Sequence, residues 1–105
     1  MNKVTVIHQA FEKFPKMVAD VNVGKRTGEE ALSYAYLRTQ NLKGSWSRKG
    51  NPDSSVNVTV LTSLPEIDGQ TYGLRSTSMG DMMILGNSTY EVAPVGFDEV
   101  FTADV

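Results

Sequence analysis

The chain of 105 residues contains no cysteine, one histidine and one tryptophan. Without cysteine it has no disulfide bonds, no thiol catalysis and no thiolate metal site. A metal site built on His8 would need further ligands, and neither an HExxH pattern nor a second histidine is present. The residues therefore predict neither a metal nor another cofactor.

Several signatures of enzymatic chemistry are also missing. The sequence has no GxSxG nucleophile elbow, no phosphate-binding glycine loop and no GxGxxG fingerprint. The carboxylates do not recur at a spacing that indicates paired acid and base groups. These absences predict a protein that is not an enzyme.

Long apolar runs are missing as well. The N-terminal sequence MNKVTVIHQAFEKF has no such run and no small-residue cleavage site. We therefore expect neither a signal peptide nor a membrane-spanning helix. Together with the lack of cysteine, this suits a reducing compartment such as the cytoplasm.

Charge is spread unevenly over a net −2. Residues 25–50 carry six cations against two carboxylates, whereas residues 51–105 carry one cation against eight carboxylates. Such a division indicates either a charged face of the molecule or two halves whose charges mix in space. The basic segment 25–50 makes a nucleic-acid partner an option, although the pI of about 5.3 weighs against general nucleic-acid binding.

The N-terminal part predicts a strand followed by a helix. Alternation over residues 3–9 indicates a strand. Residues 10–24 fit either a helical face, which Pro15 disfavours, or a second strand near its end. Thr27-Gly28-Glu29-Glu30 has the form of a capping box, which predicts one main helix near residues 28–42 that ends close to Gly44.

The C-terminal part indicates strands and turns. Strands are expected at residues 56–60, 82–85, 90–93 and 97–101, with turns at Asp68-Gly69 and Gly86-Asn87-Ser88. The prediction is a single α+β domain, residues 1–105, with a mixed or mostly antiparallel sheet of about four to six strands and the helix packed on it. Residues 56–60 and 97–101 would form exposed sheet edges through which a homodimer can pair.

Trp46 is the main candidate for a binding residue. It stands in the serine-rich loop 44–55 and is followed by Arg48 and Lys49. An aromatic beside two cations is typical of a protein interface or a single-stranded nucleic-acid site. The alternative is that Trp46 folds back over the sheet as core. Arg38 on the predicted helix is placed with this partner-binding set.

Arg75 is the second candidate. It is the only cation after residue 50 and begins the polar stretch RSTSMGD. With its neighbouring hydroxyls it could bind a partner, an anion or a small ligand, or it could pair with a nearby carboxylate. Gly80 and Asp81 in the same stretch indicate the turn that precedes a hairpin.

Two blocks of sequence resemble known proteins. Residues 78–85, 90–92 and 96–100 resemble the YodL-like tail of small phage and mobile-element proteins, and residues 31–36, 39–41 and 44–47 are similar to uncharacterised phage early proteins. The resemblance covers about half of the chain and implies no catalytic residue. It implies a phage-type accessory protein in the host bacterial cytoplasm.

These observations favour a non-enzymatic protein that binds a host or phage protein. Partner-binding residues are expected to be Trp46, Arg48, Lys49, Arg38 and Arg75. Two alternatives stay open: a nucleic-acid-binding module that uses residues 25–50, and a small-ligand or anion-binding protein with its site at Arg75–Asp81.

Overall fold

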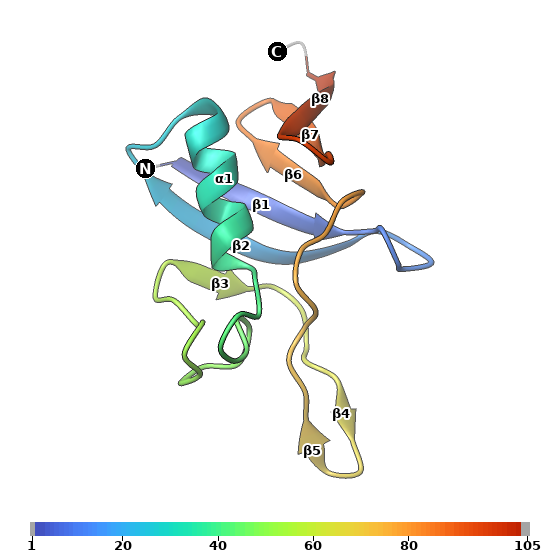
Figure 1. Ribbon diagram of the computed structural model, residues 1–105. Helices are drawn as coiled ribbons and strands as arrows, with labels where there is room; N and C mark the ends of the chain where they lie inside the picture. The colour runs from blue at the N-terminus through green and yellow to red at the C-terminus, as the bar shows by residue number, and fades with distance from the viewer. Residues whose placement is uncertain (1, 104–105) are drawn as a thin grey trace.

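A six-stranded antiparallel sheet with one helix on one face forms the molecule (Figure 1). The computed structural model describes residues 2–103. The strand order is β3-β2-β1-β6-β7-β8. The strands are β1 (Asn2–His8), β2 (Lys16–Gly24), β3 (Val58–Val60), β6 (Met82–Leu85), β7 (Ser88–Val92) and β8 (Phe97–Thr102). The α+β class and the antiparallel sheet predicted from the sequence are confirmed.

The core lies between this sheet and the helix α1 (Gly28–Arg38), which packs on β1, β2 and β6 (Figure 1). In β1 the alternate residues Val4, Val6 and His8 are buried on the helix side. Burial of such valines stabilises the fold by about 1.5–3 kcal/mol each. The side of β1 that carries Thr5 and Ile7 faces away from α1.

Residues 16–24 form a strand, so the strand alternative for this ambiguous region is the correct one. Val6 pairs with Ala19 and Ile7 pairs with Met17, which leaves Val18 as an extra residue in β2. Both Val18 and Ala19 are buried. This irregularity explains why simple alternation is weak in the sequence of β2.

The helix differs from its prediction at both ends. The Thr27 side chain makes no capping bond, and Gly28 follows it with a φ of 52°, so the expected capping box does not form. The helix ends at Arg38 rather than near residue 42, because the Thr39 hydroxyl donates to the Ala35 carbonyl (2.9 Å) and the Thr39 N–H donates to that of Tyr36. Local hydrogen bonds from threonine compete with helix continuation in this way. Gly44 is therefore not the residue that ends the helix.

A small two-stranded hairpin, β4 (Glu66–Ile67) and β5 (Gln70–Thr71), projects away from the main sheet (Figure 1). The predicted Asp68-Gly69 turn joins its strands, with φ values of 54° and 78°. Positive φ at both central residues is typical of the tight turns that suit hairpins. The predicted hairpin around Gly86 is confirmed as β6 and β7.

The sheet edges lie where the sequence predicted them. β3 and β8 are the outermost strands of the six-stranded sheet. β3 begins two residues later than expected, and Val56 is 98% exposed. Pairing of two copies through either edge remains a prediction.

None of the helices in residues 2–103 is long and apolar enough to cross a membrane.

Trp46 is a core residue. Its side chain is 1% exposed, and its indole Nε1–H donates to the carbonyl of Arg75 at 2.9 Å. Its ring meets the His8 ring edge-on, with 6.2 Å between centroids. The loop 44–55 therefore attaches to the core through Trp46, and the tryptophan also holds the segment that leads from β5 to β6.

Trp46→Ala is expected to lower the free energy of unfolding by about 3–5 kcal/mol, because it removes a large buried ring and leaves a cavity. Urea denaturation followed by circular dichroism measures this loss. Val56→Ala, at a residue that is 98% exposed, is the matched control and should change stability by less than about 0.5 kcal/mol. An unchanged stability of Trp46→Ala would show that the tryptophan is not part of the core.

Candidate functional site

The loop between β1 and β2 extends beyond the end of the sheet (Figure 1). We call residues 9–15 the Phe loop, because Phe11 is 74% exposed and Phe14 is 71% exposed. Met17, which follows the loop in β2, is 58% exposed. Aromatic and methionine side chains are enriched at protein interfaces, and methionine adapts to varied partner surfaces.

The base of the Phe loop is held by the carboxylate of Asp81, which is fully buried. Its Oδ1 accepts the backbone N–H groups of Gln9 and Ala10, both at 2.9 Å, and its Oδ2 accepts that of Ser78 at 2.8 Å. Gln9 also donates from its amide side chain to the carbonyl of Gly80. A single carboxylate thus joins the start of the Phe loop to the turn before β6.

Gly80 is required where the two segments meet. Its φ is 92°, and a Cβ at this position would lie 3.2 Å from the Cβ of Ala10. Glycine adopts positive φ without steric cost, whereas any other residue would be strained there and would press its Cβ against Ala10. The glycine turn predicted from the sequence is therefore confirmed, and its closest neighbour is the Phe loop.

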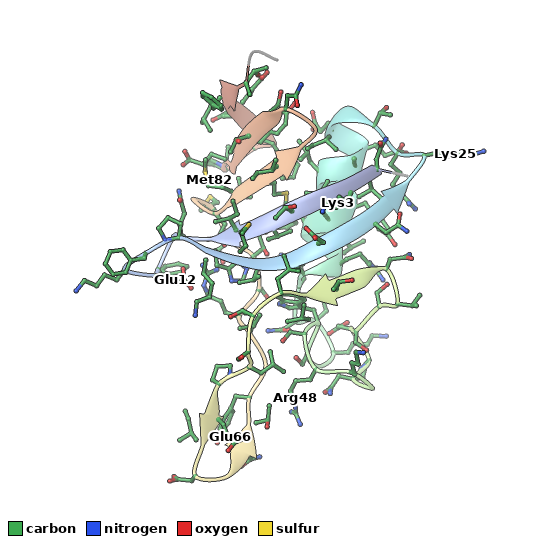
Figure 2. All side chains as sticks on the ribbon, turned by 180° about the vertical axis from the view of Figure 1, so that it is seen from behind. Lys3, Glu12, Lys25, Arg48, Glu66 and Met82 are labelled. Carbon is green, nitrogen blue, oxygen red and sulfur yellow. The ribbon has the colours of Figure 1, made fainter. Side chains whose placement is uncertain are left out.

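Arg75 completes the attachment. Its Nη1 and Nη2 donate to both oxygens of Asp81 at 2.8 Å, and its Nε and Nη2 donate to both oxygens of Glu12 at 3.0 and 2.8 Å. The guanidinium also lies 4.9 Å from the centre of the Phe11 ring. Two-point pairing of arginine with carboxylates fixes orientation as well as charge. Figure 2 shows Glu12 on the loop at the end of the sheet.

The electrostatics of this network favour the ionised forms. Burial raises the pKa of Asp81, but hydrogen bonds from Arg75 and from the backbone of Ala10, Ser78 and Gln9 outweigh burial and lower the pKa to about 2. The hydrogen bond from Arg75 likewise lowers the pKa of Glu12, and the hydrogen bond to Asp81 raises the pKa of Arg75. All three groups are therefore charged at neutral pH.

His8 lies beneath this network as a neutral core residue. It is 2% exposed, and its Nε2 lies 3.0 Å from the hydroxyl of Thr77. Burial and the charge of Arg75 lower the pKa of His8. The histidine therefore connects β1 to the segment before β6, and it lacks the solvent access that a general base needs.

Two of the expected partner-binding residues have internal roles. Trp46 is buried, so the prediction that it is a surface anchor is wrong in this structure and the core alternative holds. Arg75 uses every guanidinium nitrogen on Glu12, Asp81 and the carbonyl of Ser76. An anion would have to displace two carboxylates there, so the geometry opposes the proposed anion site at residues 75–81.

The other three expected residues remain accessible. Arg48 and Lys49 are exposed in the loop 44–55, and Arg38 is half-buried at the end of α1. Figure 2 shows Arg48 well away from Glu12 and the Phe loop. The fold therefore does not bring these three cations to the site that Phe11 and Phe14 form. Within residues 2–103, no group of three or more histidine, aspartate or glutamate side chains is arranged to hold a metal ion.

The Phe loop was not identified from the sequence. Its signal is the pair Phe11 and Phe14 in the charged stretch FEKFPK, whose spacing also fits a helical face. Pro15 argued against that helix and was the useful observation. The partnership of Arg75 with Glu12 has no sequence signal, because 63 residues separate the two.

Comparisons with protein-family models, with curated proteins and with solved structures find no match to this chain. The resemblance to YodL-like phage proteins therefore stays a prediction.

Asp81→Asn is expected to lower the free energy of unfolding at pH 7 by about 3 kcal/mol, because it leaves Arg75 with an uncharged partner in a buried site. In the wild type, the ionised Asp81 carboxylate adds to the free energy of unfolding above pH 4, and this addition is lost as pH falls through the folded pKa of about 2. The difference in stability between wild type and variant should therefore narrow by about 2 kcal/mol between pH 5 and pH 2.

Urea denaturation at a series of pH values measures this difference. Asp98→Asn, which changes an exposed carboxylate on β8, is the control and should follow the wild-type curve. A constant gap between wild type and Asp81→Asn down to pH 2 would mean that the Asp81 charge does not stabilise the fold.

Proposed function

We propose that the protein is a non-enzymatic, phage-type accessory protein that binds a host or phage protein in the bacterial cytoplasm, and that the Phe loop is its contact surface. The phage context comes from the resemblance of residues 78–100 to YodL-like tails. The contact surface comes from the exposed phenylalanines and the network that holds them.

The observation that carries the proposal is the combination of exposure with rigid support. Phe11 and Phe14 keep more than two thirds of their surface in water. At the same time, a buried carboxylate and an arginine fix the loop that carries them. Covering an exposed phenylalanine contributes about 1.5–3 kcal/mol. A loop that is already ordered loses less conformational entropy on binding than a flexible one.

Charge defines the kind of surface that would fit. Glu12 is paired with Arg75, and Lys13 and Lys16 are the cations beside the two rings. The Lys13 amine lies 5.7 Å from the centre of the Phe14 ring. A partner pocket with an apolar floor and carboxylates at its rim would complement both features.

The internal roles of the polar residues support a binding function over catalysis. The buried His8 bonds to Thr77, and Asp81 accepts from three backbone N–H groups as well as from Arg75. Neither group is free to exchange a proton with a substrate.

The double variant Phe11→Ser/Phe14→Ser should lose its partner. Affinity capture from host lysate, quantified by mass spectrometry, should enrich a discrete protein with the wild type and not with this variant. The stability of the variant should fall by less than about 1 kcal/mol, because the rings are exposed and only the contacts of Phe11 with Arg75 and of Phe14 with Lys13 are lost.

Phe101→Ser is the matched control, since Phe101 is 62% exposed on β8. It should capture the same protein as the wild type. If the Phe11→Ser/Phe14→Ser variant captured the same protein as the wild type, the assignment of the Phe loop would be contradicted. Equal loss of that protein with Phe101→Ser would contradict it as well.

A further inference from the structure

Among residues 2–103, no carboxylate lies within ion-pair distance of the cations of residues 25–50. Within residues 2–103 the cations that form salt bridges are Lys3 and Arg75, and the neutral His8 lies 4.0 Å from Asp81. The six unpaired cations are Lys25, Arg26, Arg38, Lys43, Arg48 and Lys49. This is unexpected in a chain that carries more carboxylates than cations. The basic segment 25–50 and the acidic segment that follows it therefore do not neutralise each other through salt bridges among the described residues.

Two of these cations stack on one aromatic ring. The guanidinium carbon of Arg26 lies 3.8 Å from the centre of the Tyr34 ring, and that of Arg38 lies 5.7 Å from it. The Tyr34 hydroxyl accepts from the amide of Asn57 at 3.0 Å, which fixes the ring. The Nε of Arg38 is buried with no hydrogen-bond partner within the described residues. Arg26 also donates from Nη1 to the carbonyl of Val23 at 3.3 Å. Contact with Tyr34, together with this carbonyl for Arg26, therefore holds the two guanidinium groups.

The loop that follows α1 supplies the remaining cations. Arg48 and Lys49 are exposed there, and Lys49 lines a cavity of about 650 Å³ that also has hydroxyl groups from Ser54, Ser55 and Thr59 and no carboxylate. Asp53 is the carboxylate of this loop, and its Oδ2 accepts three backbone N–H groups, those of residues 42–44. These hydrogen bonds, that of Gly44 most, and more weakly the charge of Lys43 lower the pKa of Asp53.

We propose that these residues form a second binding surface, the basic band (Arg26, Tyr34, Arg38, Lys43, Arg48 and Lys49), and that it binds single-stranded nucleic acid. Lysine and arginine neutralise phosphates, and arginine planes and aromatic rings stack on unpaired bases. The stacked pair on α1 and the cations of the adjoining loop supply both elements. An acidic protein would use the charges but would have no need of the fixed planar groups.

The basic band and the Phe loop are separate surfaces, so this inference stands independently of the proposed protein partner. Figure 2 shows Lys25, beside Arg26 at the start of α1, at the opposite end of the sheet from Glu12 in the Phe loop. Arg48 lies below the sheet in the same view. A variant of one surface therefore leaves the other intact.

Fluorescence anisotropy with a labelled 20-nucleotide single-stranded RNA and DNA tests the proposal. In about 20 mM salt we expect a Kd on the order of 10 μM that weakens steeply as salt rises. Arg48→Gln/Lys49→Gln should weaken binding on the order of tenfold and reduce the salt slope by about 1.4, or about 0.7 for each lost phosphate contact. Arg26→Gln/Arg38→Gln should weaken binding at least as much.

Lys13→Gln/Lys16→Gln is the charge-matched control, because it removes the same charge from the other end of the sheet. It should change the Kd by less than about twofold. Since Arg38 is half-buried, circular dichroism must confirm the folding of its variant, and the exposed Arg48/Lys49 pair carries the test if that variant unfolds.

Polyglutamate of equal charge is the competitor that separates nucleic acid from an acidic protein. We expect polyglutamate to displace the labelled oligonucleotide only at a far higher concentration of negative charges than unlabelled oligonucleotide needs. Three results would each overturn the proposal. The first is no binding of the oligonucleotide in low salt, and the second is a loss of affinity in the Lys13/Lys16 control as large as in the basic-band variants. The third is displacement of the labelled oligonucleotide by polyglutamate as effective as by unlabelled oligonucleotide.

Discussion

The Asp81 carboxylate is the interaction on which the arrangement of this small domain depends. It is fully buried, and burial alone would favour its neutral form. Three backbone N–H groups and the Arg75 guanidinium reverse that preference. The donors come from the end of β1 and from the segment before β6, which adjoin in the sheet but lie about 70 residues apart in sequence. An uncharged side chain could not satisfy all of these donors at once.

A second chain of contacts continues from this network to the helix. His8 bonds to Thr77, the N–H of Thr77 donates to the carbonyl of Thr39, and Gln40 donates to the carbonyl of Thr77. Thr39 in turn ends α1. The long irregular segment that returns from β5 to β6 is thus fixed at its polar groups, even though it pairs with no strand. Buried polar groups joined in this way specify one arrangement, because each unmade bond is costly.

The elements that depend on local pattern were predictable from the sequence. The turn at Asp68-Gly69, the hairpin at Gly86 and the sheet edges follow from alternation and turn residues, whereas the short strands β4 and β5 were not predicted. What depends on distant partners was not predictable. The capping box failed because Gly28 took a positive φ, and the helix stopped early because of Thr39 and Gln40. Trp46 looked like a surface residue because its neighbours are polar, and its buried contacts lie with His8 and Arg75.

In the candidate site, too, the features that depend on distant partners could not be predicted from the sequence. The sequence places four cations in one candidate partner-binding set, and only three-dimensional contacts divide them into internal and external groups. Arg75 is internal because two carboxylates reach it, whereas in the described part of the chain no carboxylate lies within ion-pair distance of Arg38, Arg48 or Lys49. The acidic pI is a property of the whole chain, and it says little about the basic band when the excess carboxylates do not pair with that band. Local pairing of charge, rather than net charge, is therefore the quantity that determines which surface of this protein attracts an anion.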